Sequence, residues 1–340
     1  MKVLVTGGTG YIGAHIVAAL HDAGEKVMIV DDLSRSEVNN LDNLSKILGF
    51  KPEFHKLDLS HRSAVLNFFN DKKDEIKAVI HCAAFKSVRE SVENPFLYYR
   101  NNIKGMSNLL EAMYSYEIDN LVFSSSCTVY GESKSLPVDE NTELQPTSSP
   151  YGTSKLVSEQ MIRDLCVHKP FKAISLRYFN PIGAHKSNHI GESILSSFDN
   201  LIPYITQTAI GKINHLNVYG NDYNTPDGTC IRDYIHIEDL AEAHVAAIKR
   251  LVDKKNNSNY EIFNLGTGKG YSVLEVINTF QEVNKIKVNY KIANRRDGDV
   301  EAIYADASLA EKELGWKAKR DLKEMLKSAW NWQKKIVLDE

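Results

Sequence analysis

The first half of the chain alternates short apolar runs with segments of helical length. The apolar runs are rich in Val and Ile and occupy residues 2–6, 26–30, 53–57, 77–81, 120–125 and 173–179. The helical segments between them include residues 12–24, 63–75 and 96–117. Strands that alternate with helices indicate a parallel sheet with helices on both faces, connected by right-handed crossovers. The pattern therefore predicts an α/β protein with a doubly wound parallel sheet.

After residue 180 the pattern changes to loops rich in Gly, Asn and Asp, interrupted by shorter elements. Helical patterns return at residues 236–251, 272–284 and 322–335. We expect residues 1–180 to form the main domain and residues 181–340 to form a smaller α/β lobe packed on it. A strand at 218–222 and the helix at 236–251 are candidates to return to the main sheet.

The composition is that of an ordinary globular protein with room for a large core. The 340 residues are 43% hydrophobic and 25% charged, as in most soluble domains. A formal net charge of −3 gives no electrostatic basis for binding nucleic acid or an anionic membrane. No apolar run approaches the length of a membrane span, and the N-terminus lacks the apolar segment of a signal peptide. We therefore expect a cytoplasmic protein.

Neither the cysteines nor the histidines form a pattern typical of metal binding. His185 and His189 have the spacing i, i+4, but Pro181, Gly183 and Gly191 surround them and favour a loop. No carboxylate–histidine constellation accompanies them, so we expect no metal site. Widely spaced cysteines without a CxxC pair fit free thiols in a reducing compartment; they are Cys82, Cys127, Cys166 and Cys230.

A glycine-rich turn follows the first strand directly and opens the first helix. Gly7, Gly10 and Gly13 stand in the spacing GxxGxxG within KVLVTGGTGYIG. Such glycines let the backbone turn tightly and approach a pyrophosphate, whose charge the helix N-terminus favours. The strand–turn–helix context predicts a Rossmann-type dinucleotide site.

The second strand ends in an acidic pair that bears on which dinucleotide is bound. Asp31 and Asp32 lie where a carboxylate can bind both ribose hydroxyls of the adenosine and repel a 2′-phosphate. Arg35 is the one neighbour that argues the other way, since a guanidinium suits a phosphate. We expect NAD rather than NADP.

The stretch TSSPYGTSK places a tyrosine and a lysine four residues apart just after a proline. Pro150 suits the first turn of a helix, and Ser148 or Ser149 can cap it. Tyr151 and Lys155 then share one helix face. A positive charge about 4 Å from the phenol, at an effective dielectric of about 20, is worth roughly 4 kcal/mol. That would lower the pKa of the phenol by about three units, enough for a general base. On this segment alone, an ordinary amphipathic surface pair is the other interpretation, and the rest of the chain must decide between them.

These motifs together resemble the extended branch of the short-chain dehydrogenase/reductase family. The resemblance rests on TGGTGYIG, on SSSCTVYG after the fifth strand and on YGTSK. RYFNPIGAH, TCIRDYIH and NLGTGKGYS narrow it to the group of UDP-galactose 4-epimerases, and it extends from Met1 to about Lys335.

The resemblance implies roles for individual residues. The catalytic residues would be Ser126, Tyr151 and Lys155. The cofactor would contact Gly7, Gly10, Tyr11, Ile12, Gly13, Asp31, Asp32, Leu33, Ser34, Arg35, Ser36, Asp58, Leu59, Cys82, Ala83, Ala84, Phe85, Lys86, Asn101, Ser126, Tyr151, Lys155 and Phe179. The nucleotide sugar would contact Lys86, Ser126, Tyr151, Asn180, Asn200, Leu201, Asn217, Val218, Tyr219, Arg232, Arg296 through Asp299, and Ile303.

The implied reaction is NAD-dependent epimerisation at C4 of a UDP-hexose through a 4-keto sugar, which interconverts UDP-galactose and UDP-glucose. NAD would stay bound because no net oxidation occurs. The resemblance also implies a homodimer, in which the helices around 95–115 and from Tyr151 of two copies form a bundle. Residues 1–180 would be the NAD-binding domain and the second lobe would bind the nucleotide sugar.

Other readings of the same fold remain open at this point. A nucleotide-sugar 4,6-dehydratase would carry an Asp-Glu pair after the fifth strand, and a UDP-uronic acid decarboxylase usually shows an acidic residue there. The chain has SCTVYG instead. A non-catalytic NAD-binding protein would not need the intact Ser–Tyr–Lys set. A 4-epimerase that prefers UDP-N-acetylhexosamines is a further alternative.

The choice between plain and N-acetylated sugars turns on departures from the family pattern. In the family, a tyrosine at the position of Ile303 excludes N-acetyl groups and a small residue admits them. Isoleucine leaves more room than tyrosine but is stiff at χ1. We expect main activity on UDP-galactose and UDP-glucose and weaker activity on the N-acetylated pair. The loop at Ser193–Phe198 also departs from the family and is a second candidate determinant.

Overall fold

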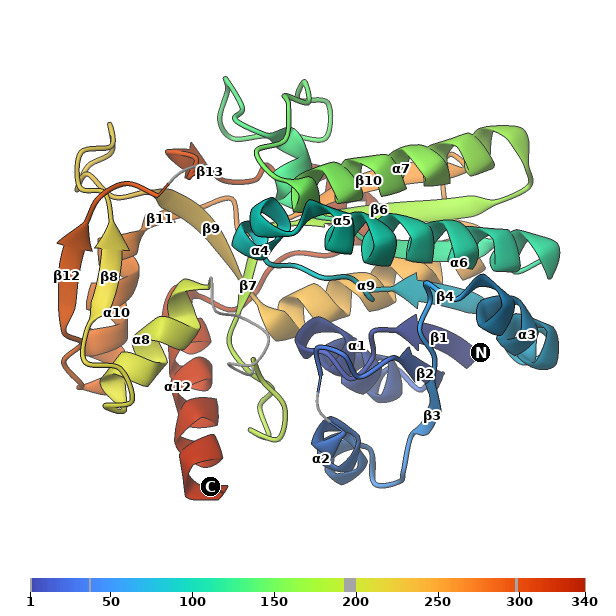
Figure 1. The fold of residues 1–340 in the computed structure, drawn as a ribbon, viewed down its shortest axis with the longest axis horizontal. Helices are drawn as coiled ribbons and strands as arrows, with labels where there is room; N and C mark the ends of the chain where they lie inside the picture. The colour runs from blue at the N-terminus through green and yellow to red at the C-terminus, as the bar shows by residue number, and fades with distance from the viewer. Residues whose placement is uncertain (1, 37, 193–199, 297–298, 340) are drawn as a thin grey trace.

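The fold was analysed in a computed structural model, which describes residues 2–36, 38–192, 200–296 and 299–339. Figure 1 shows a large sheet with helices on both faces beside a smaller lobe, which carries β8, β12, α8, α10 and α12. The C-terminus lies at the end of α12 in the smaller lobe. The expected doubly wound α/β architecture is confirmed.

The main sheet has seven parallel strands in the order β10-β6-β5-β4-β1-β2-β3. Six of them correspond to the predicted apolar runs, and β10 was not predicted. Alternate residues of a strand face opposite sides, so Val3 and Val5 enter one core and Leu4 enters the other. The strands are β1 Lys2–Thr6, β2 Lys26–Asp31, β3 Glu53–Lys56, β4 Ala78–His81, β5 Asn120–Ser124, β6 Lys172–Tyr178 and β10 Tyr260–Leu265.

Each face of the main sheet is covered by helices whose apolar sides form one of the two cores. One face carries α1 Tyr11–Asp22, α2 Asn39–Leu48 and α9 Ile237–Val252. The other carries α3 Arg62–Lys72, α6 Lys104–Ser115 and α7 Pro150–His168. Helix α9, which covers the predicted helix at 236–251, contacts β4, β5 and β6 of the main sheet.

The helix expected at 96–117 is interrupted by a π-helical turn. Short helices α4 Val88–Glu93 and α5 Pro95–Tyr98 precede this turn at Tyr99–Ile103, and α6 follows it. Within the turn, Asn102 donates a hydrogen bond to Ser154 Oγ (3.0 Å) and accepts one from the Phe85 amide (2.9 Å). The widened turn thus aims a polar side chain at α7, which a regular amphipathic pattern does not reveal.

The smaller lobe surrounds a third core with two further sheets. Residues 218–222 do not return to the main sheet, because β8 pairs with β12 instead; that expectation was wrong. Buried and exposed residues alternate in β8, which would suit a strand in either sheet. The sequence therefore did not indicate which strand pairs with β8. Its elements are β7 Asn180–Ile182, α8 Leu201–Ala209, β8 Leu216–Tyr219, β9 Ile231–His236, β11 Gly270–Ser272, α10 Val273–Asn284, β12 Tyr290–Ala293, β13 Ala302–Ile303 and α12 Leu322–Asp339. Helix α11 Ser308–Leu314 instead packs against α9 and β10 of the main domain.

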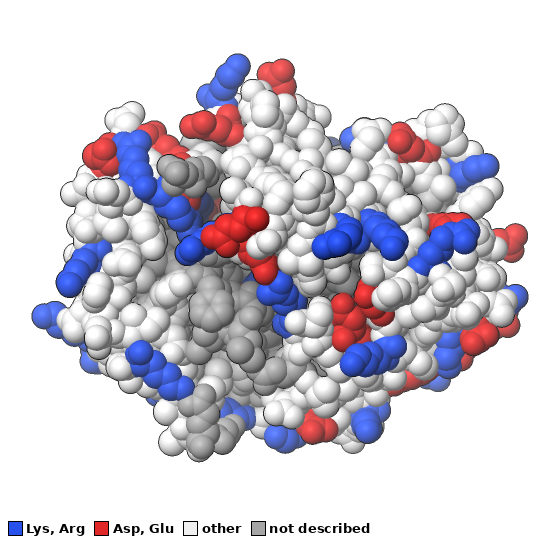
Figure 2. All heavy atoms as spheres, in the orientation of Figure 1, with Lys and Arg blue, Asp and Glu red and all other residues white. Residues whose placement is uncertain are grey.

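Two surface properties follow from this arrangement. No helix among the residues described is both long and apolar enough to cross a bilayer. On the face shown in Figure 2, acidic and basic side chains are interspersed rather than gathered into a field of one sign. This agrees with the net charge of −3 and gives no electrostatic platform for a polyanion on that face.

Candidate functional site

One cavity of about 570 Å³ lies between the carboxyl ends of the main-sheet strands and the smaller lobe. Ligands of open α/β sheets bind at this end of the strands. The cavity brings together nearly all of the residues that the sequence assigned to cofactor, substrate and catalysis. Its lining residues come from the ends of β1, β2, β4 and β5 on one side and from β8 and β9 on the other.

The glycine turn between β1 and α1 forms one end of the cavity and cannot carry side chains. Gly7 has φ +71°, and a Cβ there would lie 2.7 Å from the Ala83 amide nitrogen. A Cβ on Gly13 would lie 2.1 Å from the Gly7 carbonyl oxygen. Glycine at these two positions therefore permits the tight turn and close backbone packing that lead into the N-terminus of α1, where a dinucleotide pyrophosphate binds in this type of fold.

Asp31 ends β2 at the same end of the cavity, and neighbouring donors fix its carboxylate. It accepts hydrogen bonds from the amide of Thr9 (3.2 Å), the amide of Leu33 (2.9 Å) and the hydroxyl of Ser36 (3.1 Å). Asp32 instead accepts from the amide and hydroxyl of Ser34. Asp31 is thus the oriented carboxylate of the pair, and its position suits the ribose of a bound dinucleotide.

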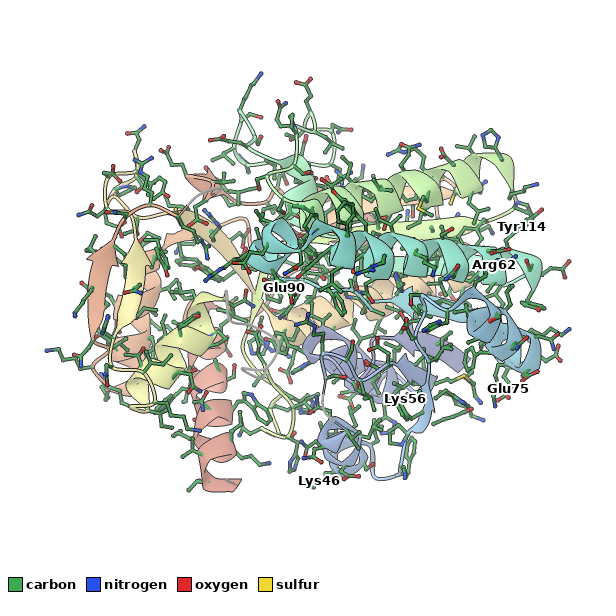
Figure 3. All side chains as sticks on the ribbon, in the orientation of Figure 1. Lys46, Lys56, Arg62, Glu75, Glu90 and Tyr114 are labelled. Carbon is green, nitrogen blue, oxygen red and sulfur yellow. The ribbon has the colours of Figure 1, made fainter. Side chains whose placement is uncertain are left out.

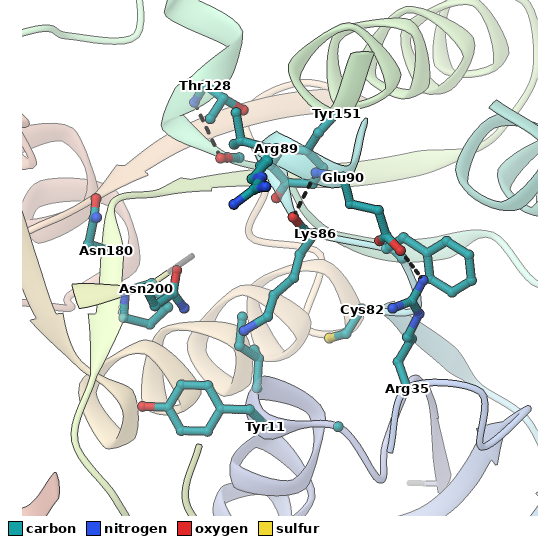
Figure 4. Close-up of a pocket in the computed structure, with 18 of the residues that line it drawn as sticks. Tyr11, Arg35, Cys82, Lys86, Arg89, Glu90, Thr128, Tyr151, Asn180 and Asn200 are labelled. Carbon is teal, nitrogen blue, oxygen red and sulfur yellow. Dashed lines mark hydrogen bonds and ion pairs between the residues drawn. The ribbon is translucent and has the colours of Figure 1, made fainter. Parts of the chain in front are cut away.

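Arg35, the residue that argued for a 2′-phosphate, is engaged within the protein. Its Nη2 donates to Glu90 Oε1 at 2.6 Å, and its guanidinium carbon lies 4.6 Å from the centre of the Phe85 ring. Figure 4 shows this ion pair at one side of the cavity. A 2′-phosphate would have to compete with the Glu90 carboxylate for Arg35, and the Asp31 carboxylate at the same end of the cavity would repel it, so the arrangement favours NAD.

The Tyr–Lys pair is built as its sequence predicts. Ser149 caps α7 by accepting a hydrogen bond from the Gly152 amide (3.2 Å), and Pro150 occupies the first turn. Tyr151 and Lys155 are both buried on the face of α7 that meets the cavity. Of the two caps left open by the sequence, Ser149 is the one used.

The electrostatics of this pair differ from the sequence expectation. Burial raises the pKa of Tyr151 to about 12, although a hydrogen bond with Ser126 opposes the shift. Burial also lowers the pKa of Lys155 to about 8. The prediction that Lys155 alone brings the phenol near working pH is therefore wrong for the protein by itself. Both groups lose hydration, and the Lys155 ammonium donates to the Ser124 carbonyl oxygen (2.7 Å) instead of the phenol.

A buried ion pair that the sequence analysis missed lies beneath these residues. Glu159, one turn after Lys155, accepts from Arg177 of β6 through two bonds of 3.0 and 2.6 Å and from the hydroxyl of Ser125 at 2.6 Å. Both charged side chains are 2% exposed. Ser125 stands between Ser124 and Ser126, so the pair fixes the backbone that carries Ser126, one of the predicted catalytic residues. The sequence feature that could have indicated this ion pair is Glu159 itself, an acidic residue four positions after Lys155.

At the other end of the cavity two arginines converge on one carboxylate. Arg296 donates to Asp299 Oδ1 at 2.8 Å, and Arg232 Nη2 lies 3.7 Å from the same oxygen. Two guanidinium groups suit bidentate binding of a diphosphate. The expected substrate residues that also line this cavity are Asn180, Asn200, Leu201, Asn217, Val218 and Tyr219.

Glu192 links two predicted site residues and was itself missed. Its Oε1 accepts from Lys86 Nζ at 2.8 Å and from Asn200 Nδ2 at 2.7 Å. In Figure 4 the side chains of Lys86 and Asn200 both extend into the cavity from opposite sides. A lone glutamate in a loop gives no sequence signal for this bridge.

Two predicted contact residues do not line the cavity. Leu33 has φ +63° and orients its amide toward Asp31. Ile303 is buried in a cluster with Cys127 and Phe179, which do line it. Ile303 therefore lies directly behind the wall and can shape the pocket through these two side chains. The candidate loop Ser193–Phe198 and the predicted contacts Asp297 and Gly298 lie outside the described residues.

The two histidines with helical spacing make ordinary polar contacts. His185 Nδ1 hydrogen-bonds Ser187 (2.8 Å), and His189 Nδ1 contacts Lys335 Nζ (2.6 Å). Over the ranges that the structure describes, no group of three His, Cys, Asp or Glu side chains could hold a metal ion.

Comparison with known proteins identifies the relatives of the chain. The family model described as GDP-mannose 4,6 dehydratase matches residues 4–329. A UDP-glucose 4-epimerase of Haemophilus influenzae is 46% identical over 335 residues, covering 98% of each chain. The solved UDP-glucose-4-epimerase of Stenotrophomonas maltophila, with bound NAD and formylated UDP-arabinopyranose, matches with a TM-score of 0.95 and 43% identity over 100% of both chains. The enzyme of Bifidobacterium longum, in complex with NAD+ and UDP, matches with a TM-score of 0.93 and 43% identity over 98% of both.

Proposed function

Because the chain belongs to the UDP-glucose 4-epimerases, we propose that it interconverts UDP-galactose and UDP-glucose with NAD as a permanently bound cofactor. The observation that carries the proposal is the set of residues that line one cavity. It holds the glycine cradle with Asp31 at one end, the Tyr151–Lys155 pair in the middle and Arg232 with Arg296 at the other. Dinucleotide, sugar and diphosphate each have a matching group there.

In the reaction, Tyr151 as phenolate accepts the proton of the sugar 4-hydroxyl, and Ser126 hydrogen-bonds the phenol and steadies the transfer. The glycine turn and Asp31 would hold NAD, which would supply a reversible hydride acceptor for C4 and, in its oxidised form, a positive charge. Lys155 donates a hydrogen bond to the Ser124 carbonyl oxygen and thereby connects α7 to the end of β5. Arg232 and Arg296 would retain the diphosphate while the 4-keto sugar turns over.

The charge supplied with the cofactor would offset part of the rise in the pKa of Tyr151. At a pKa of about 12, only a minute fraction of the phenol is ionised at neutral pH. Each added positive charge within about 4–6 Å lowers a phenol's pKa by about 1–3 units. One such charge would bring the pKa of Tyr151 from about 12 to about 9–11, so the bound cofactor would make ionisation of the phenol less costly.

The segment after β5 argues against the dehydratase and decarboxylase alternatives. The residues that follow Ser126 are Cys127 and Thr128, so no carboxylate is present to act on C5 or C6 of the sugar. The family model described as GDP-mannose 4,6 dehydratase spans this segment, but elimination requires an acid and a base that this position lacks.

The test is to purify the protein without added NAD, measure the NAD released by denaturation, and incubate the enzyme separately with UDP-galactose and UDP-N-acetylgalactosamine. We expect about one NAD per chain and conversion of UDP-galactose to UDP-glucose without an added oxidant. Accumulation of an oxidised sugar with stoichiometric NADH would replace the epimerase with a dehydrogenase. Greater turnover of the N-acetylated sugar would establish the alternative substrate preference.

We also propose that two copies pair through α6 and α7. A hollow between these helices is lined by Leu110, Tyr114, Met161 and Leu165, and the side chain of Tyr114 is 44% exposed. Figure 3 places Tyr114 near the C-terminal end of α6, on the outer side of the molecule. Two such surfaces form a four-helix bundle and bury apolar side chains that one copy exposes.

Light scattering at micromolar concentration tests this pairing. We expect a dimeric mass for the native protein and a monomeric mass for Tyr114→Glu. Tyr290→Glu is a matched control, because Tyr290 on β12 is similarly exposed, at 42%, but lies on the smaller lobe. A monomeric native protein contradicts the proposal.

We place the enzyme in the cytoplasm, as expected from its four free cysteines: Cys82, Cys127, Cys166 and Cys230. Fractionation of the source cells with detection of the chain tests this location. Recovery with secreted or membrane fractions would overturn it.

A further inference from the structure

Three side chains meet across the dinucleotide end of the cavity. Arg35 comes from the loop between β2 and α2, whereas Phe85 lies between β4 and α4 and Glu90 lies within α4. Arg35 donates to Glu90 Oε1 at 2.6 Å, and its guanidinium carbon stands 4.6 Å from the centre of the Phe85 ring. All three line the cavity, and Figure 4 shows the ion pair between the two segments.

The β4–α4 half of this contact is firmly anchored. Tyr98 is fully buried, donates to Glu90 Oε2 at 2.9 Å and packs edge-on against the Phe85 ring at 5.9 Å. The backbone of Phe85 makes two hydrogen bonds with Asn102, of 2.9 and 3.0 Å. Glu90 and Phe85 therefore present a fixed carboxylate and a fixed ring face to Arg35.

The β2–α2 half is ordered by the acidic pair that precedes it. Asp31 accepts from the Leu33 amide, and Asp32 accepts from the amide and hydroxyl of Ser34. These bonds set the course of the loop that carries Arg35. The side chain of Arg35 crosses from a segment that would contact the adenosine ribose to one that would contact the rest of the dinucleotide.

We propose that Arg35, Phe85 and Glu90 form a clasp that slows release of the bound dinucleotide. The inference rests on the proposed function and deepens it. An epimerase regenerates its oxidised cofactor in every cycle, so a released cofactor leaves the chain idle. Opening the cavity at this end requires the Arg35–Glu90 ion pair and the Arg35–Phe85 stacking contact to break together. The clasp acts on dissociation, the step in which related binding sites differ most.

The magnitude follows from the exposure of the pair. Arg35 and Glu90 are 44% and 28% exposed at their side chains, and exposed ion pairs and cation–π contacts are individually weak. Acting together, they should slow NAD release by about tenfold, which corresponds to about 1.4 kcal/mol. Arg35→Ala and Glu90→Gln should each produce most of this acceleration, because each breaks the ion pair.

The experiment compares release rates of NAD from the purified holoenzymes after dilution, by assaying NAD in the filtrate over time. Arg35→Lys keeps the charge but loses the planar stacking on Phe85, so it should restore part of the retention. Arg295→Ala is the matched control, since Arg295 makes the same two contacts elsewhere. It pairs with Asp222 at 2.7 Å and stacks 4.0 Å from the Tyr223 ring, and it does not line the cavity.

Faster release from Arg35→Ala and Glu90→Gln, with native release from Arg295→Ala, supports the clasp. Unfolding midpoints of the cofactor-free variants equal to the native one would exclude a general loss of stability as the cause. Native release rates in both clasp variants overturn the clasp while leaving the proposed function intact. A native protein that holds no NAD overturns the proposed function, and the clasp with it.

Discussion

Replacing Glu159 tests how the buried ion pair supports the catalytic segment. Glu159→Leu removes the carboxylate that accepts two bonds from Arg177 and one from Ser125. The guanidinium of Arg177 is then left 2% exposed without its partner. The substitution preserves apolar volume on α7, so the lost charge dominates its effect.

The expected destabilisation can be estimated from this geometry. Removing one partner of a buried pair costs about 3–5 kcal/mol, because the remaining charge stays desolvated. Replacing both partners with apolar residues of similar volume is often close to neutral. We therefore expect Glu159→Leu and Arg177→Met each to cost about 3–5 kcal/mol, and the double variant to cost less than either single one.

Urea unfolding of the cofactor-free variants measures these differences, with the shift of the midpoint read at constant m-value. Glu282→Leu is the control, because Glu282 forms a similar ion pair with Lys323 at 3.0 Å but both are about 60% exposed. It should change stability by less than about 1 kcal/mol. A cost below about 1 kcal/mol for Glu159→Leu, or a double variant as unstable as the sum of its parts, would refute the reasoning.

Three further results are expected. Tyr151→Phe should lower kcat at least about 100-fold with nearly unchanged UDP-sugar affinity, and near-native turnover at pH 8 would show that the base is misassigned. Ile303→Gly should raise activity on the N-acetylated sugars relative to the plain ones and Ile303→Tyr should lower it, by up to about 10–200-fold; an unchanged ratio in both would exclude a gating role. Burial lowers the pKa of His15, His81 and His236 from 6.5 to about 3. The unfolded chain therefore takes up protons first as the pH falls below 6.5, and stability should drop by up to about 4 kcal/mol per pH unit near pH 5. Equal urea midpoints at pH 7 and pH 5 would contradict this.

The parts of the fold that sequence predicted are those set by local pattern. Apolar runs marked six strands of the main sheet, and Pro150 with Ser149 marked the start of α7. The position of β10 could not be read in this way. Its pairing with β6 depends on a long-range contact across the second half of the chain. No residue of YEIFNL indicates which strand it pairs with.

The candidate site shows the same division between local and long-range information. The glycines and acidic residues near the first two strands indicate a dinucleotide site by their spacing, so the sequence analysis identified them. The Glu159–Arg177 pair and the Glu192 bridge join segments distant in the sequence, and single charged residues resemble surface charges until the fold is known. The pKa of Tyr151 was misjudged because its degree of burial is a property of the whole fold.

The strand order of the main sheet has a consequence for how the protein is made. During synthesis, a chain that has emerged only as far as residue 180 has β6 at an open sheet edge, with its backbone groups unpaired. The same nascent chain lacks α9, whose Leu240, Ile248 and Leu251 cover one face of the sheet. The N-terminal half therefore reaches its final form only after β10 leaves the ribosome, and a fragment ending near residue 180 should aggregate rather than fold alone.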